Sequence, residues 1–305
     1  MGMPKLVFFF DGTGNGPCES NPSNVYKLYN AFEHRDDPDI TSFYCAGPGA
    51  TEFDTFAGKV AGSGIIDNIK KAYRDLARNY EGTSEIALFG FSRGAYTVHM
   101  LMWLLNKCGI PQDVSDCDTI VDRFINNPEN PDIATFSMVP APIIAFVGVW
   151  DIVKSVMPNR DFMDETIPCS VKRAYHAMAL DELRKNFPVM KWKENGNTQL
   201  TQEWFAGVHS DIGGGYPLHG LSDIAYKWIQ DAAMASGIVS DLILPDGFRE
   251  CPDQELNNPF ADDPKWIALG QCARKFEGET VHPSVFERHK LVAAYTPKAS
   301  EWHWA

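Results

Sequence analysis

The sequence predicts an α/β fold with a mostly parallel sheet and helices on both faces. Short apolar runs typical of buried strands alternate with segments of helical spacing along most of the 305 residues. Hydrophobic residues make up 44% of the chain, which suffices for one large core. No Ser/Gly-rich or Pro-rich linker interrupts the pattern. We therefore expect a single domain over residues 1–305, with a core at about 5–235 and a C-terminal excursion at 240–305.

The first half of the chain contains three expected strands and three expected helices. Leu6–Phe10 is an apolar run that stops at the polar turn Asp11–Gly16. Ser23 is suited to cap a helix over 23–34, because apolar residues recur there every three or four positions. By the same two criteria we expect a strand at 41–45, a helix at 65–80, a strand at 85–89 and a helix at 93–108.

The second half alternates in the same way. Ile143–Val149 is a continuous apolar run of the kind found in buried parallel strands. We further expect a helix at 169–187, a strand at 203–208 and a helix at 222–236. The Pro-, Asn- and Asp-rich stretches leave the sheet and form a lid or a binding rim; they are 111–140, 152–200 and 240–305.

Composition excludes several classes of protein. The net charge of −13 does not suit a nucleic-acid binder, because phosphate contacts need Lys and Arg. The seven cysteines are scattered and never spaced CxxC, so we expect neither a disulfide framework nor a structural zinc site. No other metal cluster or cofactor fingerprint is evident, and we expect no cofactor. The N-terminal run LVFFF is too short for a signal peptide, which indicates cytoplasmic synthesis and only peripheral membrane contact.

Ser92 is the candidate nucleophile. It lies in GFSRGAY, directly after the strand that ends at Phe89 and at the start of the next helix. This strand-turn-helix context is that of a nucleophile elbow, whose tight turn needs small residues at Gly90 and Gly94. The alternative is a glycine-lined bend with an inert serine.

A serine hydroxyl attacks only when a base takes its proton, and His209 is the candidate base. It follows the strand EWFAGV; the alternative is a loop histidine bonded to backbone. A carboxylate must fix the histidine tautomer, and Asp151 follows the apolar run IIAFVGVW directly. Asp211 is the rival, although a carboxylate so close to the histidine more often bonds loop amides. The order Ser…Asp…His is that of the α/β-hydrolases.

The oxyanion formed during acyl transfer needs two hydrogen-bond donors. One is expected from the backbone of Arg93, the residue after the serine. The other is expected from Gly12 or Thr13, in the turn after the first strand. Asp11 either braces this turn for catalysis or bonds its amides for structural reasons alone. A phosphatase reading of FFFDGTGNG fails, because Phe9 stands where the nucleophilic aspartate would be.

Several motifs in one order resemble a known family over roughly residues 5–235. They are FFFDGTGN, SNVYKLY, GFSRGAY, GVWDIV, HAMALDE, FAGVHSDIGGGY and LSDIAYKWI. Together they resemble the α/β-hydrolase domain of type VI secretion phospholipase effectors and related stand-alone proteins. The resemblance implies a Ser92–Asp151–His209 triad and hydrolysis of carboxylic esters, with glycerophospholipid as the best-known substrate. It also implies leaderless export and an immunity or secretion partner.

Three functions remain open at this stage. The first is a lipase-like serine ester hydrolase. The second is an esterase or thioesterase for a small soluble substrate. The third is an interaction module on a hydrolase scaffold whose triad is a relic. A lipid-active enzyme should expose apolar side chains near its site, and the excursions offer aromatic candidates, namely Phe53, Phe56, Phe162, Trp192 and Trp266.

Overall fold

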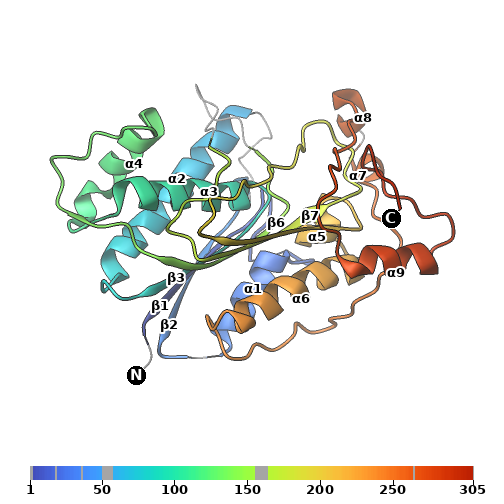
Figure 1. The fold of residues 1–305 in the computed structure, drawn as a ribbon, viewed down its shortest axis with the longest axis horizontal. Helices are drawn as coiled ribbons and strands as arrows, with labels where there is room; N and C mark the ends of the chain where they lie inside the picture. Colours follow the sequence, from blue (N-terminus) through green and yellow to red (C-terminus); the bar gives the residue numbers. More distant parts are fainter. Residues whose placement is uncertain are drawn as a thin grey trace.

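The computed structural model describes residues 3–17, 19–35, 37–49, 58–154, 164–263 and 265–304. Within these residues, six parallel strands form one sheet in the order β2-β1-β3-β6-β7-β8 (Figure 1). The strands are β1 (Lys5–Phe10), β2 (Ile40–Cys45), β3 (Glu85–Phe91), β6 (Ile144–Trp150), β7 (Arg173–Ala179) and β8 (Gln199–Phe205). A separate antiparallel pair consists of β4 (Ile110–Pro111) and β5 (Met138–Val139).

Helices cover both faces of the sheet, as predicted (Figure 1). One face carries α2 (Gly58–Asn79), α3 (Arg93–Cys108) and α4 (Cys117–Asn126), which is preceded by the short 3₁₀ helix η1 (Val114–Asp116). The other face carries α1 (Asn24–Glu33) and α6 (Gly220–Ala235). The remaining helices are α5 (His209–Gly213), α7 (Pro259–Asp262), α8 (Lys265–Leu269) and α9 (Pro283–Leu291).

The apolar strands are continuous rather than alternating because both faces are buried. In β1, Leu6, Phe8 and Phe10 join the core under α2 and α3. Val7 and Phe9 point the opposite way, into the core under α1 and α6. The N-terminus of α1 is also as expected, since the Ser23 hydroxyl accepts a hydrogen bond from the Tyr26 amide at 3.1 Å.

The helix expected at 169–187 is wrong, because this segment forms strand β7. Its Ala and Met residues favour a helix, and the placement of the segment between β6 and β8 overrides that preference. The period of two is visible once the strand is known. Ala174, His176 and Met178 share one face, and Tyr175 and Ala177 share the other.

The segment expected as a C-terminal excursion packs against the β7–β8 side of the sheet. Phe276, Val285 and Tyr295 form a third apolar cluster with Met178 and Trp204. Two backbone hydrogen bonds to Trp204 hold residues 280–282 along β8. The Trp204 amide donates to Thr280 O at 3.0 Å, and the His282 amide donates to Trp204 O at 2.9 Å. The C-terminal segment therefore covers the edge of β8, which would otherwise be open to pairing.

Candidate active site

Ser92 occupies a strained turn between β3 and α3. Its backbone has φ 57° and ψ −123°, a region that non-glycine residues rarely adopt. Its amide donates to Trp150 O at 3.0 Å, so the turn is fixed against the end of β6. The side chain makes no helix-capping bond, and no hydrogen bond to its hydroxyl is present among the described residues. Such strain typically marks a functional residue.

The glycines around Ser92 are required by close packing. A Cβ at Gly94 would lie 2.1 Å from Phe10 O and 2.4 Å from Asp11 O. A Cβ at Gly90 would lie 2.8 Å from the Ala95 Cα. The turn therefore packs directly against the backbone that follows β1.

We expect Gly94→Ala to lower the free energy of unfolding by about 2–3 kcal/mol, because two backbone carbonyls must move to admit the methyl group. Urea denaturation of both proteins measures the difference. An unchanged midpoint would show that the loop after β1 is not packed on α3 as described.

Asp151 and His209 lie together, although they are 58 residues apart in the chain. His209 Nδ1 lies 2.5 Å from Asp151 Oδ2, and both side chains are buried. Asp151 directly follows β6, which lies next to β3 in the sheet, and it has a positive φ of 44°. His209 is the first residue of the short helix α5.

Asp211, the other candidate carboxylate, makes different contacts from Asp151. Its Oδ2 accepts a hydrogen bond from the Val208 amide at 3.0 Å, and its Oδ1 accepts one from Asn257 Nδ2 at 2.6 Å. This is the loop-bonding arrangement that the sequence offered as the alternative. Asp211 thus holds the start of α5, while Asp151 holds the imidazole.

Arg274 is a part of the site that the sequence did not indicate. Its guanidinium forms a forked pair with Asp151, through Nη1 to Oδ1 at 2.6 Å and Nη2 to Oδ2 at 2.8 Å. Both side chains are buried. No local signal marks Arg274, because it lies in an irregular stretch 123 residues beyond its partner.

The charges favour an ionised carboxylate beside a neutral imidazole. Burial alone would raise the pKa of Asp151, but the Arg274 charge and the hydrogen bonds from His209 and Arg274 hold that pKa well below its usual range. Burial lowers the pKa of His209, and Asp151 opposes this shift only in part. A neutral imidazole at His209 is able to accept a proton, as the candidate base must.

Aromatic rings pack against His209 on two sides. The Phe91 ring, next to Ser92 in the chain, lies 4.6 Å from the imidazole between ring centroids, and the Phe187 ring lies at 4.9 Å. The His209 amide donates to Glu182 Oε2 at 3.1 Å, and Glu182 pairs with Arg184 at 2.8 Å. Glu182 belongs to the motif HAMALDE, whose role the sequence left unassigned.

The turn after β1 lies beside the Ser92 turn. A Cβ at Gly12 would lie 2.7 Å from the Phe91 ring. Asp11 braces this turn from within, since its carboxylate accepts bonds from Gly12 N at 2.7 Å, Ser23 Oγ at 2.8 Å and Tyr44 Oη at 2.6 Å. Burial raises the pKa of Asp11 to about 6 despite these three bonds.

The amides of Gly12 and Thr13, the two candidates for the second oxyanion donor, differ in their hydrogen bonding. The Gly12 amide is engaged by Asp11 Oδ1. No hydrogen bond from the Thr13 amide is present within the described part of the chain, and the buried Thr13 hydroxyl has no partner there either. Thr13 is therefore the better candidate of the two. Arg93, the other candidate donor, opens α3 directly after Ser92, and burial lowers the pKa of its side chain to about 10.

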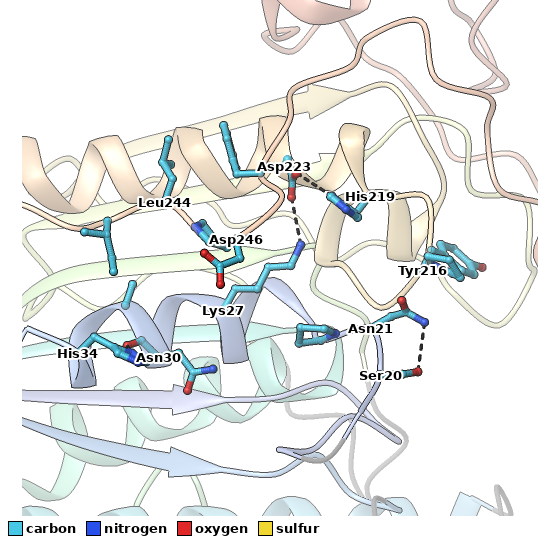
Figure 2. A pocket seen from close by; sticks show the side chains of 16 residues that line it. Ser20, Asn21, Lys27, Asn30, His34, Tyr216, His219, Asp223, Leu244 and Asp246 are labelled. Atoms are coloured by element: carbon cyan, nitrogen blue, oxygen red, sulfur yellow. Dashed lines mark hydrogen bonds and ion pairs between the residues drawn. The ribbon is translucent and has the colours of Figure 1, made fainter.

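A cavity of about 470 Å³ lies apart from these residues, between α1, α6 and the loop at 243–248 (Figure 2). Lys27, Asp223 and His219 form a chain of polar contacts along its wall, at 3.1 and 2.7 Å (Figure 2). Among its described lining residues there is none that we predict for the active site. The cavity does not bear on the chemistry of Ser92.

The remaining sequence predictions have mixed outcomes. Trp192 and Trp266 are buried, so neither exposes an apolar surface, whereas Phe53, Phe56 and Phe162 lie outside the described residues. Within the described part of the chain, no group of His, Cys, Asp and Glu could hold a metal ion. No helix there is long and apolar enough to cross a membrane.

The parallel sheet, the strained serine turn and the buried carboxylate–histidine pair place this chain in the α/β class of hydrolase-like folds. The family model "T6SS, Phospholipase effector Tle1-like, catalytic domain" matches residues 4–232. The chain belongs to this family, and its fold is the hydrolase fold of a phospholipase effector family. Arg274 lies outside the matched residues.

Individual relatives are distant. Uncharacterized protein YEL023C of Saccharomyces cerevisiae is 24% identical over 227 residues, which cover 60% of this chain and 32% of that protein. A crystal structure of an uncharacterized Pseudomonas aeruginosa protein is 15% identical with a TM-score of 0.46, covering 88% of this chain and 48% of that one. The structure of the Tle1 effector bound to the VgrG spike is 17% identical with a TM-score of 0.43, covering 70% of this chain and 51% of that one. The chain thus spans about a third to a half of the length of these relatives.

Proposed function

We propose that this protein is a serine hydrolase that cleaves carboxylic esters through Ser92, His209 and Asp151. The observation that carries the proposal is the 2.5 Å contact between His209 Nδ1 and Asp151 Oδ2. The same imidazole packs against the ring of Phe91, the residue before the strained Ser92. This arrangement supports a nucleophile at a helix N-terminus and a base with a fixed tautomer at one end of the sheet.

The steps follow from these positions. Ser92 Oγ attacks the acyl carbonyl carbon while His209 Nε2 takes the hydroxyl proton, and Asp151 holds the Nδ1–H side of the ring. The amides of Arg93 and Thr13 donate to the oxyanion. The intermediate collapses as His209 returns the proton to the leaving alcohol. Water, activated by His209, then attacks the acyl-enzyme and releases the carboxylic acid.

The pH dependence of kcat/KM should report His209. Only the neutral imidazole accepts the serine proton, so activity is retained above the pKa of His209 and lost as pH falls through it. Because burial lowers this pKa from 6.5, we expect the acid limb to have its midpoint below pH 6.5. Initial rates with p-nitrophenyl butyrate between pH 4 and 9 measure it. A midpoint above 6.5 would contradict the proposed base.

For the substrate we propose glycerophospholipid, supported by the family and by the surface of α8. Trp266 packs on Phe187, beside His209, at 5.2 Å between ring centroids. Its neighbours Ile267 and Leu269 are 61% and 44% exposed. In Figure 1, α8 stands out from the body of the protein, where these two side chains can enter a lipid surface.

The double variant Ile267→Ser/Leu269→Ser separates lipid from soluble substrates. We expect hydrolysis of phosphatidylcholine–phosphatidylglycerol vesicles to fall by about tenfold, because two aliphatic side chains no longer enter the bilayer. Turnover of p-nitrophenyl butyrate should be unchanged. Ile143→Ser is the matched control, since Ile143 is 53% exposed just before the amino end of β6, remote from the site. Equal vesicle activity in all three proteins would favour a small soluble ester instead.

For delivery we propose export by a type VI secretion system with a spike partner, as the family and the complex of the Tle1 effector with the VgrG spike suggest. An epitope-tagged chain should reach the medium from a producing strain and be retained when the secretion sheath is deleted. Equal release by both strains would contradict this route.

A further inference from the structure

Arg274 uses every donor of its guanidinium inside the protein. Besides the fork to Asp151, Nη1 donates to Ala179 O at 2.8 Å, and Nη2 and Nε donate to Phe187 O at 2.9 and 3.2 Å. The planar fork matches the carboxylate in a way that a lysine ammonium cannot.

The backbone at Arg274 is fixed from two directions. The Ser300 amide donates to Arg274 O at 2.8 Å, and the Cys272 amide donates to Leu183 O at 2.8 Å. The guanidinium is thus held by a segment that is itself anchored to the loop after β7 and to the last residues described. Asp151 completes the arrangement, since its two oxygens also accept from His209 Nδ1 and from Ala179 N at 2.8 Å.

The charge balance depends on this arginine. Without it, the buried Asp151 carboxylate would have only His209 as a counter-charge and would favour the imidazolium, which cannot accept the Ser92 proton. With it, the resting pair of carboxylate and guanidinium is neutral overall, and a neutral His209 is compatible with burial.

We propose that Arg274 is a positioning residue that orients the Asp151 carboxylate and compensates its charge, so that His209 rests as a neutral base. The inference rests on the proposed function and adds to it a residue from beyond the family match. Arg274 acts through Asp151 and has no role in substrate binding.

Other titratable groups lie around the Asp151–His209 pair, and they do not replace Arg274. Glu182 and Arg184 lie after β7 and act on the imidazole in opposite directions, and they are paired with each other. Asp211, on α5, is bonded to Val208 N and Asn257. His176, on β7, has its Nε2 bonded by the Ile152 amide at 3.2 Å, and burial lowers its pKa to about 4, which keeps it neutral. Besides His209 itself, Arg274 is the only charged side chain among the described residues that contacts the Asp151 carboxylate.

Two variants test the inference. In Arg274→Met the charge and the fork are both lost, and we expect kcat to fall about 100-fold and the acid limb of kcat/KM to move up by about one pH unit. In Arg274→Lys the charge remains but the forked pair is lost. We therefore expect a smaller fall in kcat than in Arg274→Met, and a shift of the acid limb less than half as large. KM for p-nitrophenyl butyrate should stay within about twofold in both, because Arg274 does not touch the substrate.

Arg288→Met is the matched control. Arg288 is also buried in the C-terminal segment, but it donates to Pro252 O and Gln254 O and does not contact Asp151. We expect it to lower the urea midpoint without moving the acid limb. If all three variants lose activity in proportion to stability and keep the same acid limb, Arg274 is only structural and the inference is overturned.

Titration of His209 by NMR, through its ¹³C-labelled Cε1, does not require turnover. In folded Arg274→Lys and Arg274→Met the midpoint should lie higher than in the wild type, and more so in the methionine variant. Unchanged midpoints would overturn the inference even if the wild type is an active esterase. If the two variants show this midpoint shift but the wild type hydrolyses no ester, the proposed function is contradicted instead.

Discussion

Ser92→Ala should lower kcat for p-nitrophenyl butyrate by at least about 10⁴-fold, leaving only the activity that substrate binding and the oxyanion donors provide. The effect is large because no other group can form the acyl-enzyme. Since the wild-type hydroxyl makes no capping bond, its loss should leave the unfolding midpoint nearly unchanged. Steady-state kinetics and urea denaturation of the same preparation measure both effects.

Ser84→Ala provides a matched control. Ser84 and Ser92 are both 5% exposed and lie at opposite ends of β3, so both variants remove a buried hydroxyl from the same strand region. Only the Ser92 variant should lose turnover. Activity within tenfold of wild type in Ser92→Ala would show that another residue is the nucleophile or that the activity comes from a contaminant.

Asp151→Asn should lower kcat by about 10⁴-fold, because an amide can donate to His209 Nδ1 and favour the tautomer that cannot take the serine proton. The same change leaves the buried Arg274 without its counter-charge, which costs about 3–5 kcal/mol of stability. The assay therefore has to be run at a temperature where far-UV circular dichroism shows the variant to be folded.

Asp211→Asn distinguishes the two candidate carboxylates. Asp211 holds Val208 N and Asn257, and burial raises its pKa to about 6, so the amide variant should keep kcat within about tenfold. If the losses were reversed between the two variants, Asp211 would be the partner of His209 during turnover and the resting geometry would be misleading.

Local patterns were enough to predict five of the strands and the turn at Ser92. The runs at Leu6–Phe10 and Ile143–Val149 are apolar because helices bury both faces of the sheet, and that burial is visible in composition alone. The chain order of Ser92, Asp151 and His209 predicted the carboxylate–histidine contact, since parallel strands bring their carboxyl ends to one edge.

The missed features depend on contacts between distant segments. The segment of strand β7 has the composition of a helix because alanine favours helices and is depleted in strands, and pairing with β6 and β8 overrides that preference. Arg274 sits in a stretch without periodicity, and its importance arises from a carboxylate 123 residues earlier. A sequence can indicate that a buried aspartate needs a counter-charge, but it cannot indicate which of the chain's 27 Lys and Arg residues supplies it.

The most direct test of the central claim is to map the adduct of a fluorophosphonate probe by tandem mass spectrometry. The account predicts one stoichiometric adduct on Ser92 in the wild type, slower labelling in Asp151→Asn and none in Ser92→Ala. An adduct on a different serine, or no adduct on a folded protein at neutral pH, would contradict it.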